Sequence, residues 1–278
     1  MEFKFGVRGH DIISKGSPED FAKAIASYGF HYVQLVFPKA FGDYSYSDEY
    51  VARVKKALDK NNIKVAMLGA YFNPVHSDIN VVEKGINNFK ENIRISHVFG
   101  EDVPVGSETG SFNDSPWIYV PKNRTEEGYQ QSKAVFADLA KVGLENNVPL
   151  TIEPAFGHVM WNVETLKRLI GEISLPNVFE TIDLYNLLDA SNFESRDEIF
   201  HLAVSTFGPT VRIIHLKDAK VIDGKLTQMA PGEGEFHYEF MLREIAKYCP
   251  NAVLVFEGVL PDKIQKSYSY LKNVAKNL

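Results

Sequence analysis

Four apolar segments in the second half of the chain each end in a residue that can bind a metal ion. The segments are PLTIE, NVFETID, VRIIH and NAVLVFE, and they end at Glu153, Asp183, His215 and Glu257. A charge beside a dry interior is costly when it has no partner. Four such residues in succession therefore predict one shared site, where a cation compensates the three carboxylates.

The donor set combines three carboxylates with one imidazole. Such a mixed oxygen and nitrogen set suits Mn²⁺, Mg²⁺, Co²⁺ or Zn²⁺, and it contains no thiolate that would select a soft metal. The four residues are 30, 32 and 42 positions apart, and each interval fits one strand, loop and helix. Taken singly, each carboxylate can instead cap a helix or meet an arginine, and His215 can be a buried histidine bonded to backbone. Taken together, they predict ligands on four neighbouring strands.

Strand-like runs recur along the whole chain, and helix signals fill the gaps between them. The runs begin near Phe3, Tyr32, Lys64, Asp102, Pro149, Phe179, Val211 and Ala252. Short apolar runs of this kind are typical of parallel strands that helices cover on both faces. Eight strand and helix units with no linker predict a single-domain (β/α)8 TIM barrel over residues 1–278. A doubly wound open sheet is the alternative, but no G-x-G-x-x-G sequence follows the first run.

Local signals predict helix starts and two long connections. Ser17 and Pro18 form an N-cap followed by proline at the first helical position, and Ser195 with Glu198 forms a capping-box pattern. The connections 106–123 and 218–235 are longer than usual, which is typical of functional lids. Both follow strands, so we expect both at the C-terminal end of the barrel, where active sites lie.

Composition and charge argue against several classes of protein. The chain is 45% hydrophobic and 24% charged, as in ordinary globular proteins. A net charge of −6 gives no support for a nucleic-acid or membrane-surface partner. No apolar run reaches the roughly 18 residues of a membrane span, and the N-terminus lacks the apolar core of a signal peptide. The single cysteine, Cys249, fits a reducing compartment. We therefore expect a cytoplasmic protein.

The order of the four metal-binding residues resembles the xylose isomerase-like barrel superfamily, which includes sugar and sugar-phosphate isomerases and epimerases. The resemblance spans essentially the whole chain and is carried by TIEP, IDLYN, IIHLKD and VFEG. PGEGEF, from Pro231 to Phe236, also resembles the turn that these proteins carry before their seventh helix. This ligand pattern is specific for the superfamily and weak for the substrate.

The resemblance implies a divalent cation, with Mn²⁺ as the first expectation, held by Glu153, Asp183, His215 and Glu257. It implies an isomerase or epimerase of a small sugar or hydroxy-carbonyl compound, working by proton transfer through a metal-stabilised enediolate. Glu153 and Glu257 would then be the catalytic bases on opposite faces of the substrate. The expected partner is a small carbohydrate, and a homo-oligomer is left open.

Four further residues are candidates for substrate binding. His158 follows the fifth strand and can reach substrate hydroxyls or be a solvated loop histidine. Lys217 shares a strand face with His215 and can bind a substrate oxygen or pair with a ligand carboxylate. Glu108 follows the fourth strand and can instead cap a loop. Asn186 stands where several relatives have the histidine of D-x-x-H, so their substrate preference does not transfer directly.

Glycines and aromatic residues add weaker expectations. Gly232 and Gly234 predict a tight turn rather than a phosphate loop. Tyr71, Phe72 and Trp117 are candidates for an apolar wall around a sugar ring, although loop aromatics more often serve packing.

Three other functions stay open at this stage. A lyase that removes water from a polyol ketone uses similar metal-assisted enolisation. Abasic-site endonucleases of the same superfamily use several zinc ions, and Glu235 with His237 resembles their acid-x-His pair, although Asn186 replaces an expected histidine. A barrel that only binds a metal or a sugar is the non-enzymatic alternative. The presence of two glutamates in the donor set favours an enzyme.

Overall fold

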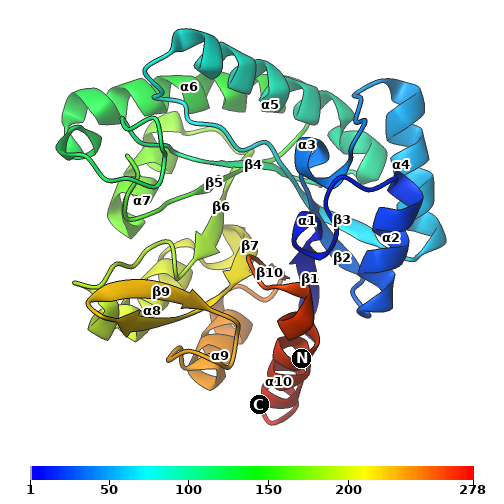
Figure 1. The fold of residues 1–278 in the computed structure, drawn as a ribbon. Coiled ribbons are helices and arrows are strands. Elements are labelled where there is room, and N and C mark those ends of the chain that lie inside the picture. The colour runs from blue at the N-terminus through cyan, green and yellow to red at the C-terminus, as the bar shows by residue number, and fades with distance from the viewer. Residues whose placement is uncertain (1) are drawn as a thin grey trace.

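Eight parallel strands close into a barrel in the computed structural model, which describes residues 2–278 (Figure 1). The strands are β1 (Lys4–Arg8), β2 (Tyr32–Leu35), β3 (Lys64–Gly69), β4 (Val105–Glu108), β5 (Leu150–Glu153), β6 (Val178–Asp183), β7 (Val211–Leu216) and β10 (Val253–Phe256). Their order around the barrel is β1-β10-β7-β6-β5-β4-β3-β2. Each predicted start lies within three residues of the observed one, and the (β/α)8 prediction is confirmed.

Eight longer helices of the described residues cover the outside of the barrel (Figure 1). They are α2 (Pro18–Ser27), α4 (Asp48–Lys60), α5 (Ile79–Phe99), α6 (Glu126–Glu145), α7 (Val163–Ile173), α8 (Arg196–Phe207), α9 (Tyr238–Tyr248) and α10 (Pro261–Lys276). Short helical turns lie in the connections: α1 (Gly9–Ile12), α3 (Phe37–Ala40), η1 (Pro121–Arg124), η2 (Phe193–Ser195) and η3 (Gly208–Thr210). None of the helices among residues 2–278 is long and apolar enough to cross a membrane.

Both predicted helix starts are confirmed, since α2 follows Ser17 and α8 follows Ser195, but only one of the two predicted capping bonds forms. Ser17 caps α2 by accepting a hydrogen bond from the backbone N–H of Asp20. Ser195 makes no such bond, because η2 runs directly into α8 and leaves its backbone outside the extended region that an N-cap needs. The capping box lies instead at Asn162 and Thr165, at the start of α7.

The connection 218–235 is not an irregular loop, which corrects the expectation from its length. It contains an antiparallel hairpin of β8 (Asp218–Ile222) and β9 (Lys225–Met229). Asp223 and Gly224 both have positive φ, 50° and 73°, as a type I′ turn requires. The Nε2 of Gln228 donates to the carbonyl of Gly258 at 3.0 Å. The hairpin is therefore fastened beside the C-terminal end of β10.

The turn in PGEGEF wraps around the carboxylate of Asp218. The two carboxylate oxygens of Asp218 accept hydrogen bonds from the backbone N–H groups of Ala219, Gly232 and Phe236, at 2.8, 2.9 and 3.0 Å. A Cβ on Gly234 would lie 2.1 Å from Asp218 Oδ1, so no side chain fits there. The tight turn expected from the glycines is present.

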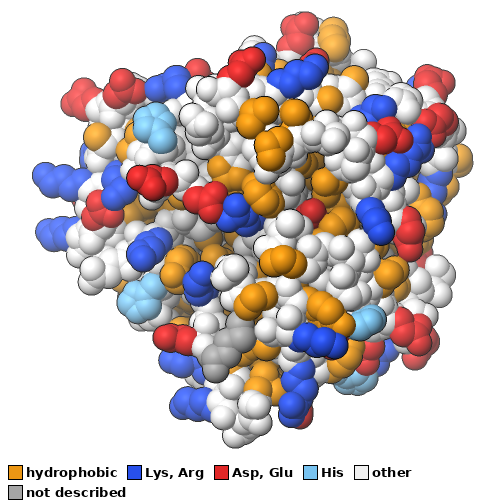
Figure 2. All heavy atoms as spheres, turned by 180° about the vertical axis from the view of Figure 1, so that it is seen from behind, with side chains coloured by type: hydrophobic (Ala, Val, Ile, Leu, Met, Phe, Trp, Pro, Cys, Tyr) orange, Lys and Arg blue, Asp and Glu red, His pale blue; other side chains and the backbone are white. Residues whose placement is uncertain are grey.

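The hydrophobic core has two parts. The larger part fills the space between the strands and the outer helices. A smaller cluster of Ala66, Met67, Ile213 and Val255 fills the inside of the barrel. This packing closes the interior and leaves the ends of the barrel as the places where a ligand can bind. On the face shown in Figure 2, acidic and basic side chains are interspersed rather than gathered into one basic surface.

Candidate metal centre

The structure brings the four predicted metal ligands together at the C-terminal end of the barrel. Glu153 and Asp183 end β5 and β6, His215 lies near the end of β7, and Glu257 directly follows β10. These four strands are neighbours, and Asp183 pairs with His215 in register. One ligand atom from each residue lies within 4.8 Å of all the others, and each residue is at most 3% exposed.

The geometry of this group fits a divalent cation. His215 Nδ1 lies 3.2 Å from Glu257 Oε2, 3.4 Å from Glu153 Oε1 and 3.5 Å from Asp183 Oδ2. His215 Nδ1 and Glu153 Oε2 are buried without a hydrogen-bond partner among the described residues. Buried polar atoms normally have a partner, and a cation between an imidazole nitrogen and three carboxylates would satisfy them.

Gln34 fixes the orientation of His215. It is fully buried in β2, and its Oε1 lies 2.8 Å from His215 Nε2. Its own Nε2 donates to the hydroxyl of Tyr71 at 2.7 Å. Because an amide oxygen only accepts, Nε2 carries a proton, and Nδ1 faces the carboxylates, where it would bind a cation through its lone pair. Gln34 was not predicted, although a glutamine inside the apolar run YVQLVF was a usable signal.

Arg8 holds Glu257 from the neighbouring strand. It ends β1, and its Nη1 donates to Glu257 Oε1 at 2.7 Å. Its Nε and Nη2 donate to Asp11 at 2.9 and 2.8 Å, and Asp11 in turn accepts the backbone N–H of Gly258 at 2.7 Å. Arg8 was not predicted, because the pairing of β1 with β10 joins positions 249 residues apart.

Lys217 pairs with the ligand carboxylates, which is one of the two roles predicted for it. Its Nζ lies 2.6 Å from Asp183 Oδ2 and 2.7 Å from Glu257 Oε2. Burial lowers the pKa of Lys217, but the carboxylates of Asp183 and Glu257 outweigh burial and raise it above its usual value. Lys217 is therefore a cation that neutralises part of the acidic group.

Asn186 and Glu108 also lie at the centre. The Nδ2 of Asn186 donates to Glu153 Oε1 at 2.7 Å, and its Oδ1 accepts from Lys217 Nζ at 3.4 Å. Glu108 ends β4 directly opposite Glu153 in the strand register. Burial, together with the Glu153 carboxylate, raises the pKa of Glu108 well above its usual range. Both residues are thus placed as predicted, and their role toward a substrate stays a prediction.

His158 is buried, which corrects its alternative prediction as a solvated loop histidine. It is fully buried, and its ring lies 4.9 Å from that of Trp117. Burial lowers the pKa of His158 to about 4. Its ring packs beside that of Trp117, and its role toward a substrate stays a prediction.

The acid-x-His pair of the endonuclease alternative lies away from the four ligands. His237 Nδ1 pairs with Asp197 Oδ2 at 2.6 Å, and the His237 side chain is 58% exposed. Within residues 2–278, the group around Glu153 is the one set of three or more His, Cys, Asp or Glu residues close enough to hold a metal ion. Glu235 and His237 therefore supply no further zinc site.

The two glutamates of the centre have different electrostatic surroundings. Burial raises the pKa of Glu153. Burial also acts to raise the pKa of Glu257, but His215, Lys217 and Arg8 outweigh it and hold the pKa well below the usual range. Burial lowers the pKa of His215, whereas Glu257 and Glu153 raise it more strongly, to about 10.

A cavity of about 650 Å³ opens beside the four ligands. Arg8, Asn186 and Lys217 line it, and each of them bonds to a ligand carboxylate. Trp117 and Phe156 belong to its apolar wall. Its volume is in the range of small-molecule sites.

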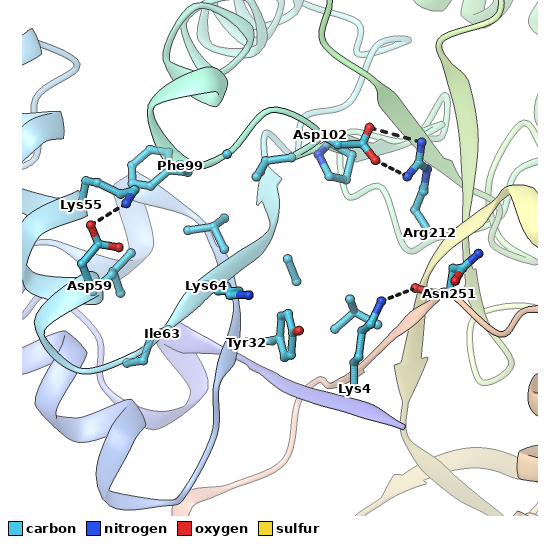
Figure 3. Close-up of a pocket in the computed structure, with 17 residues that line it drawn as sticks. Lys4, Tyr32, Lys55, Asp59, Ile63, Lys64, Phe99, Asp102, Arg212 and Asn251 are labelled. Atoms are coloured by element: carbon cyan, nitrogen blue, oxygen red, sulfur yellow. Dashed lines mark hydrogen bonds and ion pairs between the residues drawn. The ribbon is translucent and has the colours of Figure 1, made fainter. Parts of the chain in front are cut away.

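A second cavity, of about 480 Å³, lies at the opposite end of the barrel, where the strands begin (Figure 3). Lys4 and Lys64 line it together with the ion pairs Lys55–Asp59 and Arg212–Asp102. It contains none of the predicted site residues.

The chain belongs to the xylose isomerase-like TIM barrel family, whose sequence model matches residues 22–274. No curated protein sequence matches it.

Solved structures share the fold at low sequence identity. The 3-keto-D-glucoside 4-epimerase YcjR from E. coli has 13% identity and a TM-score of 0.75, over 98% of this chain and 100% of its own. The IOLI protein with a bound zinc atom has 16% identity and a TM-score of 0.74, over 99% of each chain. The probable 3-DHS dehydratase AsbF from Bacillus anthracis has 14% identity and a TM-score of 0.74, over 98% of this chain and 99% of its own.

Proposed function

We propose that this protein is a divalent-metal-dependent isomerase or epimerase of a small sugar or related hydroxy-carbonyl compound. One observation carries the proposal: Glu153 ends β5 and Glu257 directly follows β10, which are the two outer strands of the four that supply the ligand group. Two carboxylates that flank a bound substrate can remove a proton on one side and return it on the other. Membership of the family supports this proposal.

The residues of the centre have different roles in the proposed reaction. Asp183 and His215 would hold the cation, together with Glu153 and Glu257. When bound, the cation supplies Lewis-acid polarisation of a substrate carbonyl. Glu153 and Glu257 would move the proton at the neighbouring carbon.

Each proposed base is held by its own partners, which favours a fixed orientation for proton transfer. Asn186 donates to Glu153 Oε1 at 2.7 Å, and Arg8 donates to Glu257 Oε1 at the same distance. Lys217 lies 2.7 Å from Glu257 Oε2.

Mn²⁺ is the expected cation because three of the four donors are carboxylates. Mg²⁺, Co²⁺ and Zn²⁺ fit the same donor set and are the comparison metals. Adding each metal in turn to the metal-free protein and measuring the activity that returns ranks the four metals.

The experiment incubates Mn²⁺-loaded protein with a panel of ketoses in deuterated water and follows exchange at the carbon beside the carbonyl. We expect metal-dependent exchange that chelation abolishes and that Glu257→Gln lowers by about 10³-fold or more. Glu180→Gln is the matched control. Glu180 is also a buried glutamate on a barrel strand, but its carboxylate accepts from Thr210 on the outer side of β6.

The possible outcomes separate the proposal from its alternatives. Full exchange after chelation or in Glu257→Gln contradicts it. Exchange with loss of water identifies the dehydratase alternative, and nicking of an abasic duplex identifies the endonuclease. Binding of metal and sugar with no exchange identifies a binding protein.

A further inference from the structure

The cavity beside the metal centre has an inner part and an outer part of different chemistry. The inner part is formed by Arg8, Asn186 and Lys217, all bonded to ligand carboxylates. The outer part contains the rings of Trp117, Tyr119 and Phe156, which we call the aromatic wall. The Trp117 and Tyr119 residues are 55% and 45% exposed. Large exposed aromatic rings that line a cavity indicate a ligand surface.

The aromatic wall is supported from behind. The guanidinium carbon of Arg124 lies 4.9 Å from the centre of the Tyr119 ring and 4.8 Å from that of Phe156. Its Nη2 also donates to the carbonyl of Phe156 at 3.1 Å. The buried ring of His158 packs against Trp117. Rings held in this way lose little further freedom when a ligand stacks on them.

Polar groups of the hairpin and of the segment after β6 also line the cavity. Lys225 and Gln228 come from β9, and Asp189 follows β6. Gln228 is fixed by its hydrogen bond to Gly258. A lining that combines flat aromatic faces with hydrogen-bonding groups suits a sugar ring, which has C–H faces and a rim of hydroxyls.

We infer that the substrate is a glycoside whose reacting sugar binds in the inner part and whose second sugar ring stacks on the aromatic wall. The cavity volume of about 650 Å³ supports this, because volumes of about 300–1,000 Å³ accommodate drug-sized ligands. A single small sugar fills only part of this volume, which leaves room for a second ring along the wall. This inference rests on the proposed function and narrows its substrate class.

The test measures affinity by calorimetry on the Mn²⁺-loaded protein. The probes are D-fructose and four ketose disaccharides with different linkages: turanose, maltulose, isomaltulose and lactulose. We expect at least one disaccharide to bind about tenfold more tightly than fructose, a difference of about 1.4 kcal/mol. Trp117→Ala should remove most of that preference, and Tyr119→Ala should weaken it. Tyr44→Ala is the matched control, since Tyr44 is 40% exposed and lies outside the cavity lining.

Two results overturn the inference: no disaccharide binds more tightly than fructose, or the preference is unchanged in both Trp117→Ala and Tyr119→Ala. Deuterium exchange separates this failure from that of the proposed function. If fructose shows metal-dependent exchange but no disaccharide binds more tightly, the proposed function holds and the glycoside substrate is rejected. If a disaccharide preference depends on Trp117 but no exchange occurs, the glycoside ligand is supported and the proposed reaction is rejected.

Discussion

The two halves of the barrel contribute differently to the metal centre. Strands β5, β6, β7 and β10 supply the four candidate ligands, whereas β1 and β2 supply Arg8 and Gln34, which hold Glu257 and His215. The first half thus orients what the second half provides. The centre therefore depends on barrel closure, because Arg8 reaches Glu257 only through the pairing of β1 with β10.

Removing a ligand from the second half should have the largest effect. Asp183→Asn keeps the shape of the side chain and removes one carboxylate, so we expect Mn²⁺ affinity to fall on the order of 10³-fold, more than the loss of a supporting residue costs. Competition with a chelating indicator measures it. An affinity within about threefold of the wild type would show that Asp183 is not a ligand.

Removing the support of His215 in the first half should have an intermediate effect. Gln34→Leu takes away the acceptor at Nε2, and we expect a loss of about 10–100-fold in Mn²⁺ affinity. Gln34→Glu keeps an acceptor there and is the matched control. Equal affinities in the leucine and glutamate variants would refute the orienting role.

Removing Arg8 should affect turnover and Mn²⁺ affinity differently, because Arg8 both orients Glu257 and places a positive charge beside the ligands. Arg8→Met leaves Glu257 without its 2.7 Å partner, so we expect turnover to fall about tenfold. Mn²⁺ affinity should not fall, because the variant also removes a positive charge beside the ligands. Parallel measurement of kcat and of Mn²⁺ affinity tests this, with Arg8→Lys as the variant that keeps the charge. A parallel fall in both would mean that Arg8 supports the metal group as a whole.

The same difference explains which site residues were predictable. Glu153, Asp183, His215 and Glu257 each close an apolar run, so a charge at a dry strand end was visible in the sequence. Gln34 is uncharged and lies inside its run, and its partner is 181 residues away. No local pattern encodes such a pairing, which only the closed barrel creates.

The barrel was easier to predict from the sequence than the connections between its strands and helices. The strand runs and their spacing sufficed for the barrel, since eight apolar runs of similar spacing have few alternatives. The hairpin of β8 and β9 also had a sequence signal, because the turn dipeptide Asp223-Gly224 is flanked by the apolar residues Val221 and Leu226. The prediction considered only the length of this connection. The burial of His158 depends on the Trp117 loop packing over it, a tertiary contact with no sequence signature.

A change away from the four ligands, at Glu180 on β6, should leave metal binding intact and alter only stability. Burial raises the pKa of Glu180 from 4.5 to about 7, although its bond to Thr210 acts to lower it. A raised pKa in the folded state means that this contribution to stability is complete below pH 4.5 and is lost as the pH rises through about 7.

Glu180→Gln removes this titration. We expect the free energy of unfolding of the variant to match that of the wild type near pH 4.5 and to exceed it by up to about 3 kcal/mol at pH 8, because folding raises the pKa of Glu180 from 4.5 to about 7. Urea unfolding at the two pH values measures the difference. A difference that does not change with pH would contradict the pKa of Glu180.

The location of the cation is the central claim, and anomalous diffraction from crystals grown with Mn²⁺ tests it most directly. We expect one anomalous peak per chain, about 2.0–2.3 Å from one atom each of Glu153, Asp183, His215 and Glu257. Absence of a peak among these residues at saturating Mn²⁺, or a peak elsewhere in the barrel, would contradict it.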